Sequence, residues 1–224
     1  MLRGVIFDVD GTLAASNEAH ARSWVDTLSE AGYSVPFDVV WPMIGMGGDK
    51  LLPSVAGIES ESPAGKKLSA RRWEIFETKY LPLVRPTRGA RPLVERMKSD
   101  GLRLVVASSA SGNELGALLD AAGVRDLMEE TTSSSDAEDS KPDPDIVQAA
   151  VRKSGLDPDD LIMLGDTPYD VQAAIGAHVK LVALLCGGWT KEELSGASAI
   201  YDDPADLLHW YDRFPSYREI GGGR

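Results

Sequence analysis

The chain has 224 residues, of which 43% are hydrophobic and 26% are charged, and its formal net charge is −12. An acidic surplus of this size argues against nucleic acid as a partner, because nucleic-acid binding depends on clustered lysine and arginine. No apolar run approaches the roughly 20 residues that cross a bilayer, so the composition predicts a cytoplasmic globular protein without a membrane partner.

Four short apolar runs have the length and composition of buried strands. They cover residues 3–8, 102–108, 160–166 and 179–185. Helix-like segments lie between these runs, at residues 113–123, 144–155 and 168–178. Near-continuous apolar strands that alternate with helices indicate a parallel sheet covered on both faces. The predicted fold class is therefore α/β, with a Rossmann-like parallel sheet as its core.

One long insertion interrupts this alternation directly after the first strand. Residues 14–84 offer amphipathic helix-like stretches and a glycine-rich loop, "MIGMGGDK", at 43–50. The return segment, 83–92, is dense in proline, glycine and arginine, as a domain boundary would be. We therefore expect a core domain of residues 1–13 and 85–224 and a helical cap domain of residues 14–84. A polar loop is expected at 131–145, and the final "GGGR" is expected to fray.

Polar side chains gather where the predicted strands end. The residues at these positions, or in loops on the same side of the sheet, are Asp8, Asp10, Ser108, Ser109, Lys141, Asp166 and Asp170. Ligands of parallel α/β sheets bind beyond the carboxyl ends of the strands, so these side chains are expected to meet in one site at this edge of the sheet.

Converging carboxylates repel one another and recruit a hard cation such as Mg²⁺, which prefers oxygen ligands and a substrate phosphate. Next to such a cation, Asp8 could attack phosphorus as a nucleophile, while Lys141 and Ser108 stabilise the phosphoryl oxygens. Asp10 lies two residues further on and could protonate the leaving oxygen, then take a proton from water. Gly11 allows a tight turn there, and Thr12 could donate a hydrogen bond to a phosphate.

Each of these signals also has a purely structural interpretation. A strand-end "DxD" often caps a helix, Asp166 and Asp170 could cap and begin the next helix, and a single lysine such as Lys141 is usually exposed. The basic group at 66–72 is expected to be a solvated helix face, and Cys186 is expected to be a core thiol. The four motifs together, in this order, favour the catalytic interpretation.

These motifs resemble those of the haloacid dehalogenase superfamily, in the branch with a helical cap after the first motif. "DVDGT", "VVASS", "SKPDPD" and "GDTPYD" are similar to its four motifs, in the same order. The resemblance implies Asp8 as nucleophile, Asp10 as acid and base, and Ser108 and Lys141 as phosphoryl binders. It also implies Mg²⁺ held by Asp8, the backbone carbonyl of Asp10 and Asp166, with Asp170 in support. The second aspartate of the first motif favours phosphoryl chemistry over dehalogenation.

The expected activity is Mg²⁺-dependent hydrolysis of a small phosphorylated metabolite, by a monomer or small homo-oligomer. A β-phosphoglucomutase-like phosphohexomutase remains an alternative, because His20 and Trp24 have spacings similar to those of the mutase hinge segment. A phosphate-accepting receiver module that turns nothing over is a third possibility, opposed by Asp10 and by the cap-sized insertion. Substrate binding is expected to involve residues from both units, namely Thr12, His20, Gly47, Lys50 and Ser109.

Overall fold

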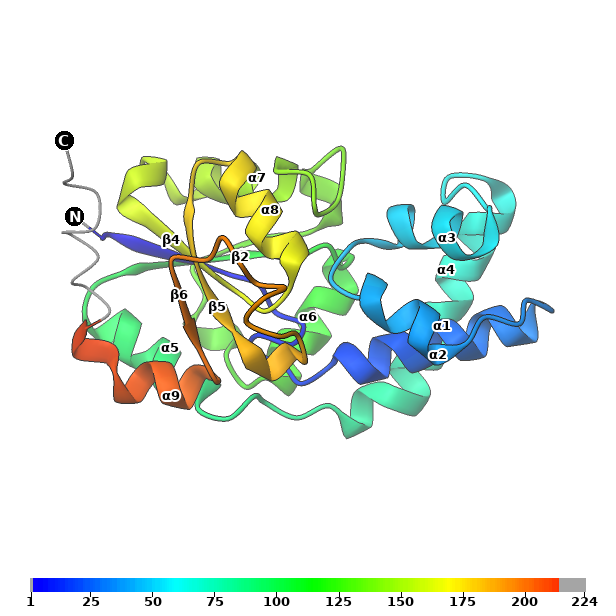
Figure 1. Ribbon diagram of the computed structural model, residues 1–224, viewed down its shortest axis with the longest axis horizontal. Helices are drawn as coiled ribbons and strands as arrows, with labels where there is room; N and C mark the ends of the chain where they lie inside the picture. The colour runs from blue at the N-terminus through cyan, green and yellow to red at the C-terminus, as the bar shows by residue number, and fades with distance from the viewer. Residues whose placement is uncertain (1, 214–224) are drawn as a thin grey trace.

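A six-stranded, wholly parallel sheet forms the centre of the computed structural model, which describes residues 2–213 (Figure 1). Its strands lie in the order β3-β2-β1-β4-β5-β6. Their bounds are β1 Gly4–Phe7, β2 Arg103–Ala107, β3 Glu130–Thr132, β4 Leu161–Gly165, β5 Lys180–Leu184 and β6 Ala199–Tyr201. The predicted α/β class is therefore confirmed. The strand order reverses beside β1, where open parallel sheets bind their ligands.

Helices cover both faces of the sheet, which explains why the central strands are apolar throughout. Val5 and Phe7 of β1 point into the apolar cluster formed with α5, α6 and α9, whereas Ile6 joins the cluster formed with α7 and α8. The bounds of these helices are α5 Ala90–Ser99, α6 Gly112–Ala121, α7 Asp145–Ser154, α8 Pro168–Gly176 and α9 Pro204–His209. All four residues of β1 are buried, so the first strand is fixed at the centre of both clusters.

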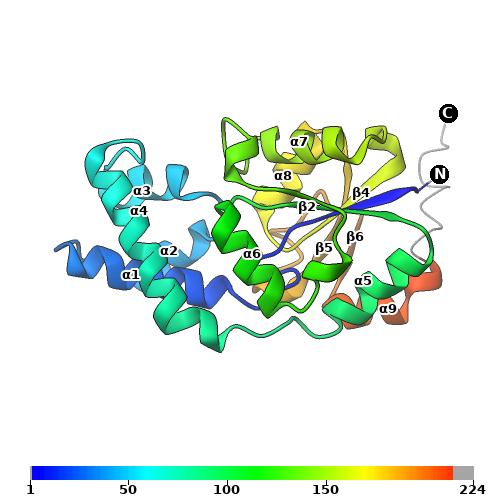
Figure 2. The ribbon, with the colours of Figure 1, turned by 180° about the vertical axis from the view of Figure 1, so that it is seen from behind.

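The inserted segment folds into helices that lie beside the sheet (Figures 1 and 2). They are α1 Asn17–Glu30, α2 Phe37–Val40, α3 Gly48–Ala56 and α4 Pro63–Ile75. Trp24 and Leu28 of α1 pack there with Leu51 and Leu52 of α3, in an apolar cluster separate from the two that flank the sheet. This part of the chain thus has a small core of its own.

Short helical turns join the main elements. They are η1 Trp41–Met43, η2 Phe76–Tyr80, η3 Leu81–Leu83, η4 Arg125–Leu127, η5 Ser134–Asp136, η6 Pro158–Asp160 and η7 Leu185–Gly187. The stretch expected to be a polar loop, 131–145, contains the end of β3 and all of η5. Among residues 2–213, no helix combines the length and the apolar character needed to cross a membrane.

Three further expectations need correction or fall outside the structure. Helix α3 begins at Gly48, within the predicted glycine-rich loop, and α5 begins at Ala90, within the predicted linker. Cys186 is exposed rather than part of the core, although its Sγ donates a hydrogen bond to the carbonyl oxygen of Gly11, 3.1 Å away. The terminal "GGGR" lies outside the described residues.

Candidate active site

The loop that follows β1 carries Asp8 to the edge of the sheet. Its backbone N–H donates to the carbonyl oxygen of Leu164 in β4, 2.9 Å away, so the parallel ladder continues to the functional residue. The carboxylate of Asp8 is 6% exposed. Gly11 then turns the chain at φ 77°, passing so close to Asp166 that a Cβ at Gly11 would lie 2.1 Å from its Oδ2. A side chain at position 11 would therefore displace the neighbouring carboxylate.

Three buried carboxylates meet at this point. Asp8, Asp166 and Asp170 each offer an oxygen, and these oxygens lie within 4.8 Å of one another. Burial, with the charges of Asp170 and Asp10, raises the pKa of Asp8 to about 7, against the opposing effect of Lys141. Burial and the charges of Asp8 and Asp170 likewise hold the pKa of Asp166 well above its usual value. Oxygen ligands with surplus negative charge in a dry site fit a hard divalent cation such as Mg²⁺.

Lys141 supplies the cationic group of this cluster. It is 1% exposed, and its Nζ lies 2.5 Å from Oδ1 of Asp8 and 2.7 Å from Oδ1 of Asp170. Burial would lower the pKa of this amine, but the two carboxylates outweigh it and hold the pKa above its usual value. Lys141 is therefore a buried cation fixed between two carboxylates, which overrules its interpretation as a surface lysine.

The start of α8 fixes Asp170. Its Oδ2 accepts hydrogen bonds from the backbone N–H of Thr167 at 3.0 Å and from the Thr167 hydroxyl at 2.8 Å. The Thr167 hydroxyl in turn accepts from the N–H of Asp170, which completes a capping box. The structural interpretation of "GDTPYD" is thus correct for Asp170, which lies in the first turn of α8, but the N-cap is Thr167 and not Asp166. The other oxygen of Asp170 remains directed at Lys141, so the cap also positions that lysine.

The carboxylate of Asp10 points toward the segment that begins the insertion. Its Oδ1 lies 2.5 Å from the hydroxyl of Ser16 and 2.6 Å from Nε2 of His20, both on the segment that begins the insertion. Burial raises the pKa of Asp10, but the charge and hydrogen bond of His20, the bond from Ser16 and the charge of Arg72 together hold that pKa below its usual value. Asp8 and Asp10, two residues apart, therefore have different environments. Such a difference typically separates a nucleophile from an acid–base group.

Two side chains near the first strand hold Asp166. The hydroxyl of Thr12 donates to its Oδ1 at 2.9 Å, and the amide of Asn17 donates to its Oδ2 at 2.9 Å. Thr12 is fully buried and bonded to Asp166, so the structure places its side chain against this carboxylate rather than toward a substrate. Asn17 keeps a buried Oδ1 for which the structure records no partner.

The two serines after β2 differ in their surroundings. Ser108 is 1% exposed, and its hydroxyl accepts a hydrogen bond from the N–H of Ala110 at 3.1 Å. Ser109 lines a small pocket next to Asp8, and its buried Oγ has no recorded partner. An unpaired buried hydroxyl in the same pocket as Asp8 is a group that a ligand can satisfy.

That small pocket, of about 60 Å³, is called the catalytic pocket below. Its walls come from the core and from the inserted helices, and its lining residues are Asp8, Asp10, His20, Trp24, Ile44, Gly45, Met46, Gly47, Gly48, Arg72, Ser109 and Ala110. The structure thus brings Asp8, Asp10, His20, Gly47 and Ser109 together.

Lys50 does not line the catalytic pocket. Its Nζ lies 2.8 Å from carboxylate oxygens of both Asp139 and Asp143, so it links α3 to the loop before Lys141. The expected role of Lys50 in substrate binding therefore has no support from its position. Arg72 of α4, assigned from the sequence to a solvated face, lines the catalytic pocket instead. Its side chain is only 13% exposed.

The family model that describes the haloacid dehalogenase-like hydrolases matches residues 5–184 of this chain. The chain belongs to this family. A phosphoglycolate phosphatase of Rhodospirillum rubrum is 30% identical over 237 aligned positions, covering 100% of this chain and 95% of that protein. A hydrolase structure from Pseudomonas syringae is 28% identical with a TM-score of 0.86, covering 94% of this chain and 98% of the other. The chain is therefore a hydrolase, related to phosphatases.

A plant relative is much longer. The protein SUPPRESSOR OF QUENCHING 1, chloroplastic, of Arabidopsis thaliana is 34% identical over 213 residues, which are 91% of this chain. This chain spans 20% of the length of that relative.

Sequence reasoning missed three polar residues at the site of this haloacid dehalogenase-like hydrolase. Asn17 holds Asp166, Arg72 lines the catalytic pocket, and Glu114 of α6 pairs with Arg72 while its Oε1 lies 3.6 Å from Nδ1 of His20. All three lie in helices, where their spacing matches that of ordinary polar faces. No local pattern separates them from solvated residues, since only the fold brings these helices to the mouth of the sheet.

Proposed function

We propose that this hydrolase is a Mg²⁺-dependent phosphatase that acts on a small phosphorylated metabolite through an aspartyl-phosphate on Asp8. One observation carries the proposal. Asp8 lies in a buried cluster with Lys141, Asp166 and Asp170, while Asp10, two residues away, is held apart by Ser16 and His20. These two environments support a role for one carboxylate in the attack on phosphorus and for the other in proton transfer.

In the first half-reaction, a carboxylate oxygen of Asp8 attacks phosphorus. The bond between phosphorus and the leaving oxygen breaks, and that oxygen takes a proton from Asp10. The Nζ of Lys141, next to Asp8, stabilises the oxygens of the transferring phosphoryl group together with the hydroxyl of Ser108. Ser16 and His20 hold the carboxyl group of Asp10 in place for this transfer.

In the second half-reaction, water attacks the phosphorus of the aspartyl-phosphate. Asp10 takes the proton from this water, inorganic phosphate leaves, and the carboxylate of Asp8 is restored. Asp10 is a carboxylate at this stage, because it has given its proton to the leaving oxygen, and it can therefore act as this base.

Mg²⁺ would be held by Asp8, Asp166 and the backbone carbonyl of Asp10, with Asp170 in support. When bound, it supplies positive charge that lets a carboxylate approach a charged phosphoryl group. The protein contributes the orientation of these ligands. Thr12 and Asn17 fix both oxygens of Asp166, and Thr167 fixes Asp170, so their carboxylates are pre-positioned.

Residues 14–84 are proposed to act as the cap that closes over the substrate, with a separate apolar cluster as their support. Within the catalytic pocket, His20, Gly47 and Ser109 are proposed to contact the substrate. The net charge of −12 supports a small-molecule substrate rather than nucleic acid. A cytoplasmic location and a monomeric or small homo-oligomeric state complete the proposal.

Hydrolysis of p-nitrophenyl phosphate, with and without Mg²⁺, tests this function. Mg²⁺-dependent release of p-nitrophenol is expected. A receiver-like module that accepts a phosphoryl group without releasing it would give no turnover, and that result would refute the phosphatase proposal.

A further inference from the structure

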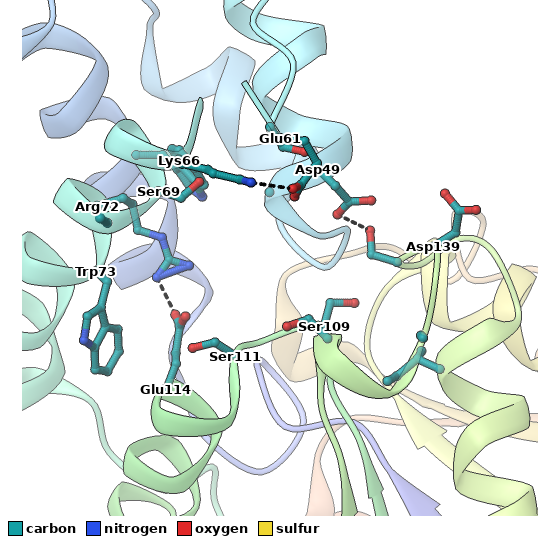
Figure 3. A pocket seen from close by; sticks show the side chains of 18 of the residues that line it. Asp49, Glu61, Lys66, Ser69, Arg72, Trp73, Ser109, Ser111, Glu114 and Asp139 are labelled. Carbon is teal, nitrogen blue, oxygen red and sulfur yellow. Dashed lines mark hydrogen bonds and ion pairs between the residues drawn. The ribbon is translucent and has the colours of Figure 1, made fainter. Parts of the chain in front are cut away.

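A second cavity opens beside the catalytic pocket and shares part of its wall. It has a volume of about 540 Å³, within the range typical of metabolite sites. Trp24, Gly48, Arg72 and Ser109 line both spaces. This cavity, called the chamber below, is bounded by α3 and α4 of the inserted segment and by α6 and the loop before α7 of the core (Figure 3). A substrate whose phosphate lies near Asp8 would therefore extend its leaving group into the chamber.

Carboxylates outnumber cations in the chamber wall. Five acidic side chains face two basic ones: Asp49, Glu61, Glu114, Glu138 and Asp139 against Lys66 and Arg72. Both basic groups are already paired, since Nζ of Lys66 lies 3.0 Å from Glu61 and Arg72 binds Glu114. A negatively charged leaving group would enter a space that holds a surplus of negative charge.

Arg72 lies where the chamber meets the catalytic pocket, and its charge is committed. The guanidinium forms an ion pair with Glu114, whose side chain is 7% exposed (Figure 3). The same guanidinium lies 5.4 Å from the ring centre of Trp24 and 5.5 Å from that of Phe76. Aromatic faces and a buried carboxylate fix it in one orientation. An anionic group on the substrate would have to compete with Glu114 for this arginine.

The remaining lining suits hydroxyl groups. Serines from both sides face the chamber, namely Ser60, Ser69, Ser109, Ser111, Ser134 and Ser140. Serine hydroxyls donate and accept, and the carboxylates of Asp49 and Glu138 accept, so an alcohol-rich group finds partners of both kinds.

We propose, resting on the phosphatase function above, that the substrate is a phosphate monoester with an uncharged, hydroxyl-rich leaving group about the size of a sugar. The Arg72–Glu114 pair excludes leaving groups that carry a carboxylate or a second phosphate. Glu114 is thus a specificity-determining residue, and it acts by neutralising Arg72.

Matched substrates test this preference directly. Glucitol 6-phosphate and 6-phosphogluconate, both open chains, differ by a hydroxymethyl group against a carboxylate on the leaving group, and glycerol 3-phosphate and 3-phosphoglycerate form a smaller pair with the same difference. The neutral member of each pair is expected to have a kcat/KM at least about tenfold higher, the effect of one charge-assisted contact. Equal values, or a preference for the carboxylates, would overturn the proposal.

A variant that removes the charge of Glu114 tests whether the preference comes from this residue or from the net negative charge of the chain. In Glu114→Gln, Arg72 becomes available to an anion, and the preference for neutral substrates is expected to shrink about tenfold. Adding Arg72→Gln to this variant should remove the gain on carboxylate substrates. Asp120→Asn is the matched control, since it removes one carboxylate of α6 that pairs with an arginine on the exposed surface, and it should leave the preference unchanged. A preference unaltered in Glu114→Gln would contradict the role of this residue.

Activity on p-nitrophenyl phosphate distinguishes a failure of the phosphatase proposal from a failure of the inference about the chamber. If the wild-type protein hydrolyses this ester but favours carboxylate substrates, the inference about the chamber fails and the phosphatase function stands. If it hydrolyses no ester with Mg²⁺ present, both fail. Circular dichroism verifies the fold of each variant, and if Glu114→Gln does not fold, the wild-type substrate ratios decide the question.

Discussion

The Nζ of Lys141 lies 2.7 Å from Oδ1 of Asp170, a residue fixed by the first turn of α8, and both side chains are 1% exposed. The same amine contacts Asp8, so one cation holds two carboxylates together. Deleting a single partner of a buried ion pair leaves charge without compensation, which costs about 3–5 kcal/mol. Lys141→Met is therefore expected to lower the free energy of unfolding by about this amount and to abolish activity.

Urea denaturation in the presence of a chelator measures the stability change, and Lys153→Met provides the control. Lys153 pairs with Asp136 at 2.7 Å, but the lysine side chain is 34% exposed. A surface pair of this kind is worth about 0–1 kcal/mol. Similar losses in the two variants would show that burial of Lys141 does not matter.

Asp8 links activity to the pH dependence of stability. Asp8→Asn is expected to abolish turnover, because an amide cannot serve as the nucleophile. In metal-free wild-type protein the pKa of Asp8 is raised to about 7, so the folded state keeps a proton that the unfolded chain releases. The free energy of unfolding should therefore fall by a few kcal/mol as pH rises from about 4 to about 7. The variant should lack this part of the decline.

Urea unfolding of both proteins in chelator, at pH 5 and at pH 8, provides the measurement. Asp166 has a raised pKa as well, so the variant keeps a smaller decline of the same sign. Identical slopes in the two proteins, or turnover by folded Asp8→Asn above background, would exclude the assigned role.

The sequence predicted the residues that end the long strands better than those that lie on helices. The ranges 3–8, 102–108, 160–166 and 179–185 each enclose one observed strand, because four or five consecutive buried residues leave a clear apolar signal. Strands β3 and β6 were missed. They have three residues each, and "ETT" has the composition of a loop. Asp8, Asp10, Lys141 and Asp166 were identified because strand ends and turns mark them in the sequence.

The cap side of the site was harder to predict. Lys50 and Arg72 are both cations of the insertion, and nothing in their local sequence indicates which one faces the catalytic pocket. That choice depends on how α3 and α4 pack on α1 and on which core carboxylate each cation meets. Asp139 and Asp143 bind Lys50, and Glu114 binds Arg72, from positions 42 to 93 residues away along the chain.

Metal removal should abolish activity. Asp8, Asp166 and Asp170 offer more carboxylates than Lys141 can pair with, so we expect the proposed reaction to need an added cation. A chelator is expected to stop hydrolysis of p-nitrophenyl phosphate, and Mg²⁺ to restore it. Ca²⁺ should inhibit, because its larger and more flexible coordination misplaces the nucleophile. Full activity in chelator would rule out a metal at this cluster.

The thiol of Cys186 is expected to react slowly with iodoacetamide. Although the residue as a whole is exposed, its sulfur is partly buried against the carbonyl oxygen of Gly11, and this burial, with the charge of Asp166, raises its pKa from 9.0 to about 12. Since the thiolate is the reactive form, its fraction at pH 8, and with it the reaction rate, should be about 10³-fold lower than for an ordinary cysteine. Urea-unfolded protein is the matched control, because Cys186 is the single cysteine of the chain. Equal rates in folded and unfolded protein would contradict the raised pKa.

The last prediction separates a phosphatase from a phosphohexomutase. A mutase must hold a bisphosphate in two orientations, so its cap needs a cation that binds the phosphate that is not reacting. Arg72 is a cation of the inserted segment that lines the catalytic pocket, which favours the mutase, but its charge is committed to Glu114. Lys50 is bound to Asp139 and Asp143, and Lys66 to Glu61.

Because Arg72, Lys50 and Lys66 are each already bound to carboxylates, the second phosphate should bind about 10- to 100-fold more weakly, the effect of one charge-assisted contact. We therefore expect the enzyme to release inorganic phosphate from β-glucose 1-phosphate without a bisphosphate activator. The assay follows glucose 6-phosphate and free phosphate together, with and without glucose 1,6-bisphosphate. If activator-dependent formation of glucose 6-phosphate outpaced phosphate release, Arg72 would have to leave Glu114 during turnover, and the enzyme would be a mutase.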